Sequence, residues 1–232
     1  MKSLIFDLPG AVNAGAEQVK RVLNEKPGAL LAISAGRSTK LLCERLSEMF
    51  REGELSLRDA RLFAVTELEG VNHVQSCRHF LTEELIERTD LRPENCTFLS
   101  GENLEKYDDM IALAGGIDLA VLGLGDNAHI GYNEPATPFD SLSHRQKLTD
   151  ATRRQLAGQF GGEDQTPEFA LTMGIKTLVA AREILVLAFG EEKAEPVFKM
   201  FYARNDSAVP AAFLQLPFSV TVCLDSAAAA KL

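Results

Sequence analysis

The stretch IDLAVLGLGDNAHIGYNEPAT, residues 117–137, decides the fold that this sequence predicts. It begins with a short run that is apolar apart from Asp118, which indicates a buried strand. Gly123 and Gly125 follow directly and predict a turn at the end of that strand. In open α/β sheets, ligands bind at the carboxyl ends of the strands. The histidine and the Asn-Glu pair that come next therefore occupy a position typical of a ligand site.

Short apolar runs alternate with amphipathic segments along the rest of the chain. The apolar runs predict strands at 29–33, 61–65, 96–99, 117–122, 183–189 and 218–223. The amphipathic segments predict helices at 11–26, 39–51, 75–89, 104–114, 171–181 and 192–203, with a short helical piece at 210–215 and an irregular region at 124–148. This order predicts an α/β fold: a Rossmann-like, doubly wound, mostly parallel sheet with helices on both faces. No linker or repeat interrupts it, so we expect a single domain over residues 1–232.

The composition of the 232-residue chain excludes several classes of function. A formal net charge of −9 argues against non-specific nucleic-acid binding, which depends on a basic surface. No run approaches the roughly 18 apolar residues of a membrane span, and the apolar start of the chain is too short for a secretion signal. The four cysteines lack zinc-site spacing and predict reduced thiols. We expect a cytoplasmic protein with no nucleic-acid or membrane partner.

A loop of small and hydroxyl-bearing residues follows the first predicted strand and precedes a helix. Free N–H groups at the start of a helix bind anions, and Arg37 and Lys40 add positive charge. The alternative is an ordinary helix cap, with Ser38 or Thr39 as the N-cap residue. The candidate phosphate-binding residues of this loop are Ala35, Gly36, Arg37, Ser38 and Thr39.

Two further loops carry ionisable side chains. Glu67 and Glu69 follow the next strand and either supply carboxylates for acid–base chemistry or form a solvated acidic loop. In the opening stretch, Glu134 can hold the tautomer of His129 and raise its basicity. A lone histidine in a loop is commonly a surface residue, but the pattern GxGxxxHIxxNEP favours a functional site.

Together the three loops resemble those of the glucosamine-6-phosphate deaminase/galactosamine-6-phosphate isomerase family, which shares a superfamily with the 6-phosphogluconolactonases. The family segment GxGxDGHIAFNEP is matched by GLGDNAHIGYNEP at 123–135. ALTMG at 170–174 is similar to the family's ALTVG, and GEEKA at 190–194 to its GxxKA. The resemblance covers nearly the whole chain, and NEP after the histidine favours the deaminase branch. It implies that His129, oriented by Glu134, opens the sugar ring and that Lys193 meets the substrate phosphate.

Two departures from the family pattern concern catalysis. Thr66 stands where the family has the Asp that moves a proton between C2 and C1, and a hydroxyl is too weak a base for that role. Glu67 is adjacent, but neighbouring side chains of an extended chain point to opposite sides, so it serves only if the loop is reshaped. Asn127 replaces an Asp that many members carry beside the histidine. It can still orient an imidazole by a hydrogen bond, but it brings no charge.

Two other departures concern the phosphate. Arg37 stands where deaminases usually have Gly, and it offers an additional phosphate contact. Gly158 aligns with a phosphate-binding Arg of the family, for which Arg37, Arg153 or Arg154 could compensate.

We therefore expect an enzyme of carbohydrate metabolism that converts galactosamine 6-phosphate or glucosamine 6-phosphate to a ketose 6-phosphate and ammonia. One alternative is a 6-phosphogluconolactonase-like hydrolase, which needs no C1–C2 proton shuttle. The other is a non-catalytic sugar-phosphate-binding protein that lost turnover with the Asp-to-Thr change at Thr66. Neither reaction needs a metal or an organic cofactor, so we expect none. The expected partner is a small sugar phosphate, and the expected assembly is a monomer or a small homo-oligomer.

Overall fold

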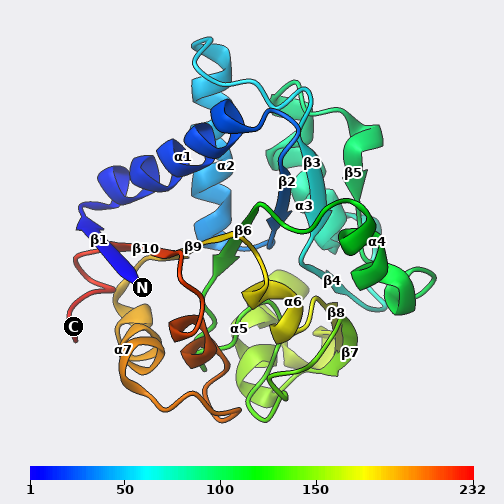
Figure 1. Ribbon diagram of the computed structural model, residues 1–232. Helices are drawn as coiled ribbons and strands as arrows, with labels where there is room; N and C mark the ends of the chain where they lie inside the picture. Colours follow the sequence, from blue (N-terminus) through cyan, green and yellow to red (C-terminus); the bar gives the residue numbers. More distant parts are fainter.

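The computed structural model describes residues 1–232 and is built on a seven-stranded sheet flanked by helices (Figure 1). The spatial order of its strands is β1-β10-β9-β6-β2-β3-β5, and every neighbouring pair is parallel. The strand bounds are β1 Lys2–Phe6, β2 Leu30–Ile33, β3 Arg61–Ala64, β5 Cys96–Thr97, β6 Leu119–Gly123, β9 Glu183–Ala188 and β10 Val220–Asp225. The predicted single-domain α/β fold with a mostly parallel sheet is confirmed.

Helices cover both faces of this sheet because its inner strands alternate their side chains between two apolar clusters. Leu31 and Ile33 of β2 pack into one cluster, whereas Leu30 and Ala32 pack into the other. The first cluster includes residues of α1 and α2, and the second includes residues of α4 and α7. The helix bounds are α1 Leu8–Glu25, α2 Arg37–Arg51, α3 Cys77–Glu84, α4 Tyr107–Leu113, α5 Asp150–Phe160, α6 Ile175–Val179 and α7 Ala194–Tyr202. None of the helices is long and apolar enough to cross a bilayer.

The strand order reverses at β2. From β2 the chain builds outward through β3 and β5, then returns to the opposite side of β2 with β6 and continues outward through β9. The loops that leave β2 and β6 consequently turn in opposite directions and open a crevice between them. Such a crevice at the carboxyl ends of the strands is the usual ligand site of an open α/β sheet.

A second, three-stranded antiparallel sheet was not predicted. It has the order β4-β8-β7, with β4 at Thr66–Leu68, β8 at Phe169–Thr172 and β7 at His144–Lys147. The predicted helix at 171–181 is therefore wrong at its start, where the chain is still in β8, and α6 begins only at Ile175. The predicted irregular region at 124–148 contains β7, whose HRQK sequence lacks the apolar signal of a strand.

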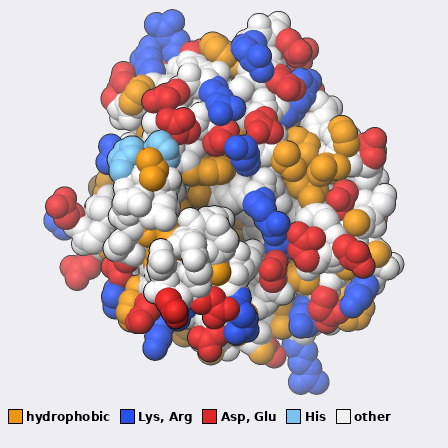
Figure 2. All heavy atoms as spheres, turned by 180° about the vertical axis from the view of Figure 1, so that it is seen from behind, with side chains coloured by type: hydrophobic (Ala, Val, Ile, Leu, Met, Phe, Trp, Pro, Cys, Tyr) orange, Lys and Arg blue, Asp and Glu red, His pale blue; other side chains and the backbone are white.

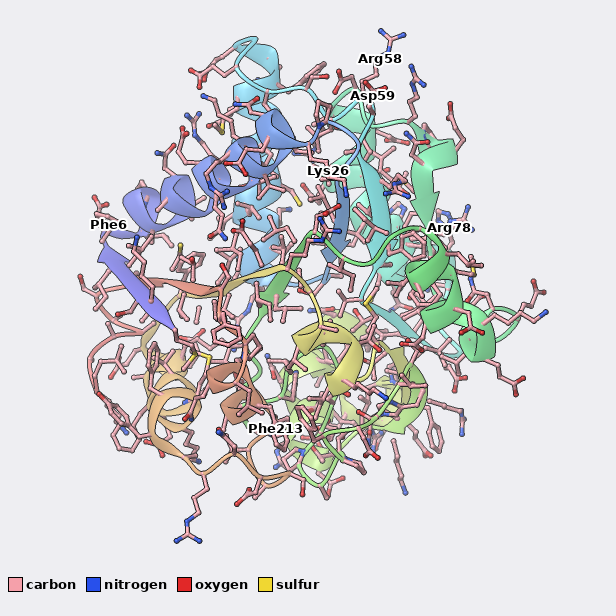
Figure 3. All side chains as sticks on the ribbon, viewed as in Figure 1. Phe6, Lys26, Arg58, Asp59, Arg78 and Phe213 are labelled. Atoms are coloured by element: carbon pink, nitrogen blue, oxygen red, sulfur yellow. The ribbon has the colours of Figure 1, made fainter.

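Charged residues at the opposite, amino-terminal edge of the sheet are structural. The buried carboxylate of Asp118 accepts hydrogen bonds from the Leu30 N–H at 2.8 Å and from Lys26 Nζ at 2.8 and 2.9 Å. Lys26 lies at the amino-terminal end of β2 (Figure 3). Burial alone would raise the pKa of Asp118, but the Lys26 and Leu30 hydrogen bonds outweigh burial and lower that pKa.

We expect replacement by alanine to have opposite effects on stability at Gly174, in the ALTMG segment, and at Gly158, in α5. A Cβ on Gly174 would overlap the backbone carbonyl oxygens of Ser141 and Leu142, which cannot move without shifting the chain. Gly174→Ala should therefore lower the free energy of unfolding by about 1–3 kcal/mol. Gly158 lies inside α5 with open space at its Cβ, so Gly158→Ala should raise that free energy by roughly 0.5–1 kcal/mol. Urea denaturation of both variants checks this, and equal midpoints would contradict the packing described for Gly174.

Candidate active site

A pocket of about 210 Å³ opens at the carboxyl ends of the central strands. Its walls are the loops that follow β2, β3, β6 and β9, with α5 completing one side. These four strands are consecutive neighbours in the sheet, so residues far apart in the sequence meet at one place. The face seen in Figure 2 is hollowed near its centre, and acidic and basic side chains lie side by side around the hollow.

One end of the pocket is the amino terminus of α2. The helix begins at Arg37 with Gly36 as its N-cap residue, and no side chain caps its first N–H groups. Ser38 and Thr39 therefore lie in the first helical turn and are not N-cap residues, which favours the anion-site interpretation over the ordinary cap. All five predicted phosphate-loop residues line the pocket: Ala35, Gly36, Arg37, Ser38 and Thr39.

Two basic side chains reach this end, and both already have acidic partners. The Lys193 ammonium is nearly buried, at 7% side-chain exposure, and lies 2.5 Å from Asp126 Oδ1. The Arg37 guanidinium is exposed and lies 3.2 Å from Glu192 Oε1. The prediction that Lys40 adds positive charge at this end is wrong. Lys40 lies outside the pocket and pairs with Glu84 at 2.8 Å.

The imidazole of His129 forms the other end and is held by a short hydrogen-bonded chain. Its Nδ1 lies 2.8 Å from Asn127 Oδ1, and Asn127 Nδ2 donates to Glu134 Oε2 at 2.6 Å. A carboxylate only accepts, so the Asn127 amide nitrogen must face Glu134 and its oxygen must face the imidazole. The imidazole consequently carries its proton on Nδ1. Its Nε2 has no hydrogen-bond partner in the protein and can act as a base at the pocket.

Glu134 lies behind this chain and does not line the pocket. Only 1% of the residue is exposed, and it accepts hydrogen bonds from the backbone N–H of Thr149 at 3.1 Å and the Thr149 hydroxyl at 3.2 Å. Thr149 is the N-cap residue of α5, so the positive end of that helix also faces the carboxylate. Glu134 Oε2 is 3.8 Å from His129 Nδ1, so the hydrogen-bonded connection between the two residues runs through Asn127.

Burial is the largest influence on the charge of His129, and it lowers the pKa of the imidazole. Glu134 and Asp126 oppose this effect and Lys193 adds to it, so the pKa stays below the ordinary value of 6.5. The imidazole is therefore neutral near pH 7, the state in which it accepts a proton.

The second glycine of the segment, Gly125, is required by the packing of His129. A Cβ at this position would overlap the ring of His129. Only hydrogen at Cα leaves room for the imidazole between the loop and the pocket, so the spacing from Gly125 to His129 is a packing requirement.

The predicted carboxylates of the acidic loop do not reach the pocket. Thr66 lines it, with its hydroxyl 3.6 Å from the Cys77 thiol. Glu67 turns away, as the extended chain predicted, and accepts from the backbone N–H groups of Leu68, Cys77 and Arg78 at 2.8, 2.8 and 3.0 Å. Among all residues that line the pocket, Glu192 is the only Asp or Glu, and it lies at the α2 end beside Lys193.

Several pocket residues were not predicted. Gln155, Leu156 and Gln159 of α5 line one wall. Asp126 was not predicted either; it does not line the pocket but pairs with Lys193, which does. Gly158, Arg153 and Arg154 do not line the pocket, so of the three arginines named as possible replacements only Arg37 lies in the pocket wall. No group of three or more His, Cys, Asp or Glu side chains is arranged to hold a metal ion.

Comparison of the sequence with known proteins gives consistent relatives. Residues 9–222 match the model of the family described as glucosamine-6-phosphate isomerases/6-phosphogluconolactonase. The glucosamine-6-phosphate deaminase of Hahella chejuensis is 38% identical over 240 aligned positions, which cover 100% of this chain and 92% of that protein. The glucosamine-6-phosphate deaminase of Colwellia psychrerythraea is 36% identical and is covered to 90%.

Comparison with solved structures separates two groups of neighbours. A monomeric glucosamine-6-phosphate deaminase of the NagB superfamily superposes with a TM-score of 0.96 at 28% identity, over 100% of both chains. The 6-phosphogluconolactonase of Trypanosoma brucei superposes with a TM-score of 0.78 at 17% identity, over 100% of this chain and 98% of the other. The second likeness concerns the fold alone.

Because Asn127 is uncharged and faces the imidazole, introducing a charge at position 127 should change the pKa of His129. Asn127→Asp should raise the pKa of His129, because a carboxylate then faces Nδ1. The neutral variant Asn127→Ser controls for the loss of the amide. NMR titration of the imidazole nitrogens measures both, and an unchanged pKa in Asn127→Asp would show that position 127 does not face the ring.

The stability of the folded chain should fall as the pH is lowered. The folded-state pKa of His129 is depressed, so the unfolded chain takes up its proton first as the pH drops below about 6.5. The stabilisation is therefore complete above that pH and is lost as the pH falls through the folded-state pKa. Urea denaturation at pH 7.5 and pH 5 measures the loss in the free energy of unfolding. This loss should be smaller for His129→Asn than for wild type, because the asparagine keeps a donor for Asn127 but does not titrate.

Proposed function

The chain belongs to the glucosamine-6-phosphate isomerase/6-phosphogluconolactonase family, and from this premise we propose that it is an amino-sugar-phosphate deaminase/isomerase. The substrate is glucosamine 6-phosphate or galactosamine 6-phosphate, and the products are a ketose 6-phosphate and ammonia. Relatives and a solved structure that carry the name glucosamine-6-phosphate deaminase support this assignment over the lactonase branch.

One observation carries the proposal: a single pocket has an anion site at one end and an oriented, neutral imidazole at the other. The first N–H groups of α2 and the Lys193 ammonium supply the anion site. His129 Nε2 supplies the base. A sugar phosphate fits this arrangement because its phosphate fixes the position of C1 relative to the imidazole.

The proposed ring opening uses His129 and Asn127. His129 Nε2 accepts the proton of the anomeric hydroxyl, the C1–O5 bond breaks, and the imidazolium returns that proton to O5. Asn127 Oδ1 keeps the Nδ1 proton in position throughout. Because Asn127 is neutral, the imidazolium is a stronger acid than it would be beside an aspartate, which favours proton return to O5.

Isomerisation then needs a base at C2. Removing the C2 proton gives an enolamine, protonation at C1 gives a ketimine, and water hydrolyses the ketimine to ketose and ammonia. Thr66 offers only a hydroxyl at this end of the pocket, and Glu67 is committed to the start of α3. We therefore assign the C2 proton transfer to His129 and expect this step to limit the rate.

The same observation favours a second candidate, hydrolysis of a sugar-phosphate lactone. That reaction needs His129 to take a proton from the attacking water and return it to the ring oxygen, with no transfer at C2. A pocket whose sugar end holds no carboxylate meets this requirement in full.

The assembly and location follow as smaller proposals. A monomer or small homo-oligomer agrees with the solved relative, which is described as monomeric. Four free cysteines fit the reducing cytoplasm. Light scattering after size-exclusion chromatography tests the assembly, and a tetramer or larger complex would contradict it.

Ammonia release from both amino sugar phosphates tests the function, with wild type and Thr66→Asp measured together. We expect measurable release by wild type and an increase in kcat of about 10²-fold or more in Thr66→Asp, because a positioned carboxylate contributes about that much to a proton transfer. Thr66→Asn is the neutral control of similar size and should not gain activity.

The remaining outcomes separate the alternatives. Hydrolysis of 6-phosphogluconolactone without ammonia release by either protein would move the assignment to the lactonase. Binding of the sugar phosphates without either reaction would indicate a protein that only binds them.

A further inference from the structure

The carboxylate of Asp126 forms an ion pair with the buried ammonium of Lys193 at the predicted phosphate site. Lys193 comes from the loop after β9 and Asp126 from the loop after β6, and these strands are neighbours. The Lys193 side chain is 7% exposed and its ammonium has no other ion-pair partner, whereas the Asp126 side chain is 41% exposed. The carboxylate therefore reaches in from the solvent side to neutralise a charge that the fold has buried.

The pairing has a physical cause. A buried ammonium is costly unless a counterion or several acceptors satisfy it. Asp126 Oδ1, at 2.5 Å from Nζ, meets that need. A phosphate oxygen meets the same need when a ligand binds, so the two anions compete for one cation.

The second ion pair at this end is different in kind. Arg37 and Glu192 are 71% and 47% exposed, so solvent screens their interaction and it contributes little. With both pairs counted, two cations at the α2 end are balanced by two carboxylates. An arriving phosphate dianion consequently meets an end with no net charge from these side chains.

We infer that Asp126 is an affinity-determining residue that competes with the substrate phosphate for Lys193 and so weakens phosphate binding. The inference rests on the proposed function, because it takes the α2 end as the phosphate site. Every ligand that places a phosphate there must displace Asp126 from the ammonium or bind beside its negative charge. The competition keeps KM high and favours release of the phosphorylated product.

The proposal predicts tighter binding when the competitor is neutralised. Asp126→Asn should bind inorganic phosphate and glucose 6-phosphate, a hexose phosphate with no amine to release, about 3- to 10-fold more tightly than wild type. The KM for glucosamine 6-phosphate should fall by a similar factor. If Asp126 only supported the loop, the same change would weaken binding, so the direction of the effect distinguishes the two roles.

A matched control is available in the same segment. Glu191→Gln removes one negative charge two positions from Lys193, but Glu191 is exposed and does not line the pocket. It should leave both dissociation constants within twofold of wild type. Asp126→Ser serves as the second variant, and circular dichroism verifies that each variant is folded.

Isothermal titration calorimetry of wild type and the three variants with both ligands decides the matter. Tighter binding by the two Asp126 variants alone supports the inference. Equal or weaker binding by them, with clear binding by wild type, overturns the inference and leaves the proposed function standing. Absence of binding of either ligand to any of the four proteins would instead refute a phosphate site at α2, and with it the proposed function.

Discussion

The parallel pairing of β2 with β6 is the constraint on which the rest of the site depends. It matches Leu31, Ala32 and Ile33 with Leu119, Ala120 and Val121, and two hydrogen bonds of Ser34 extend it beyond the end of β2. The Ser34 N–H donates to the Val121 carbonyl at 3.0 Å, and the Gly123 N–H donates to the Ser34 hydroxyl at 3.1 Å. These contacts fix the start of both loops, so the amino terminus of α2 and the imidazole of His129 face each other across a set distance.

Most of the central sheet was predictable because its strands are buried on both faces and read as continuous apolar runs. The elements that were missed carry weak signals for identifiable reasons. Helix α5 buries only Thr152 and Phe160, since it covers the pocket and not the core, so its apolar periodicity is poor. Strand β7 is polar throughout. The apolar strand β1 lies at the sheet edge with Phe6 pointing outward (Figure 3). The strands β1 and β7 are held by pairing with β10 and β8, and no local pattern of the sequence records such pairing.

The functional segments were predictable as segments, but the roles of individual side chains were not. The phosphate loop, His129 and Thr66 all line the pocket as expected. That Glu134 contacts Asn127 and reaches His129 only through it, and that Lys193 is paired with Asp126, depends on side-chain directions set by tertiary contacts. Aspartate and asparagine adjoin in the sequence at 126 and 127, yet one turns to a cation and the other to an imidazole. Both residues lie in the turn between Gly125 and His129, which directs their side chains to different partners. The residue types alone do not predict the geometry of this turn.

The pocket draws each of its chemical groups from the end of a different strand, and this has an evolutionary consequence. The strands hold their register through the core whatever the loops contain. A change of side chain at one strand end, such as position 66, therefore alters one group while the amino terminus of α2 and the imidazole keep their positions. Mutations at a single strand end can remove one reaction step or introduce another without changing the fold. A family that spans isomerases and lactonases is the expected product of such piecewise inheritance.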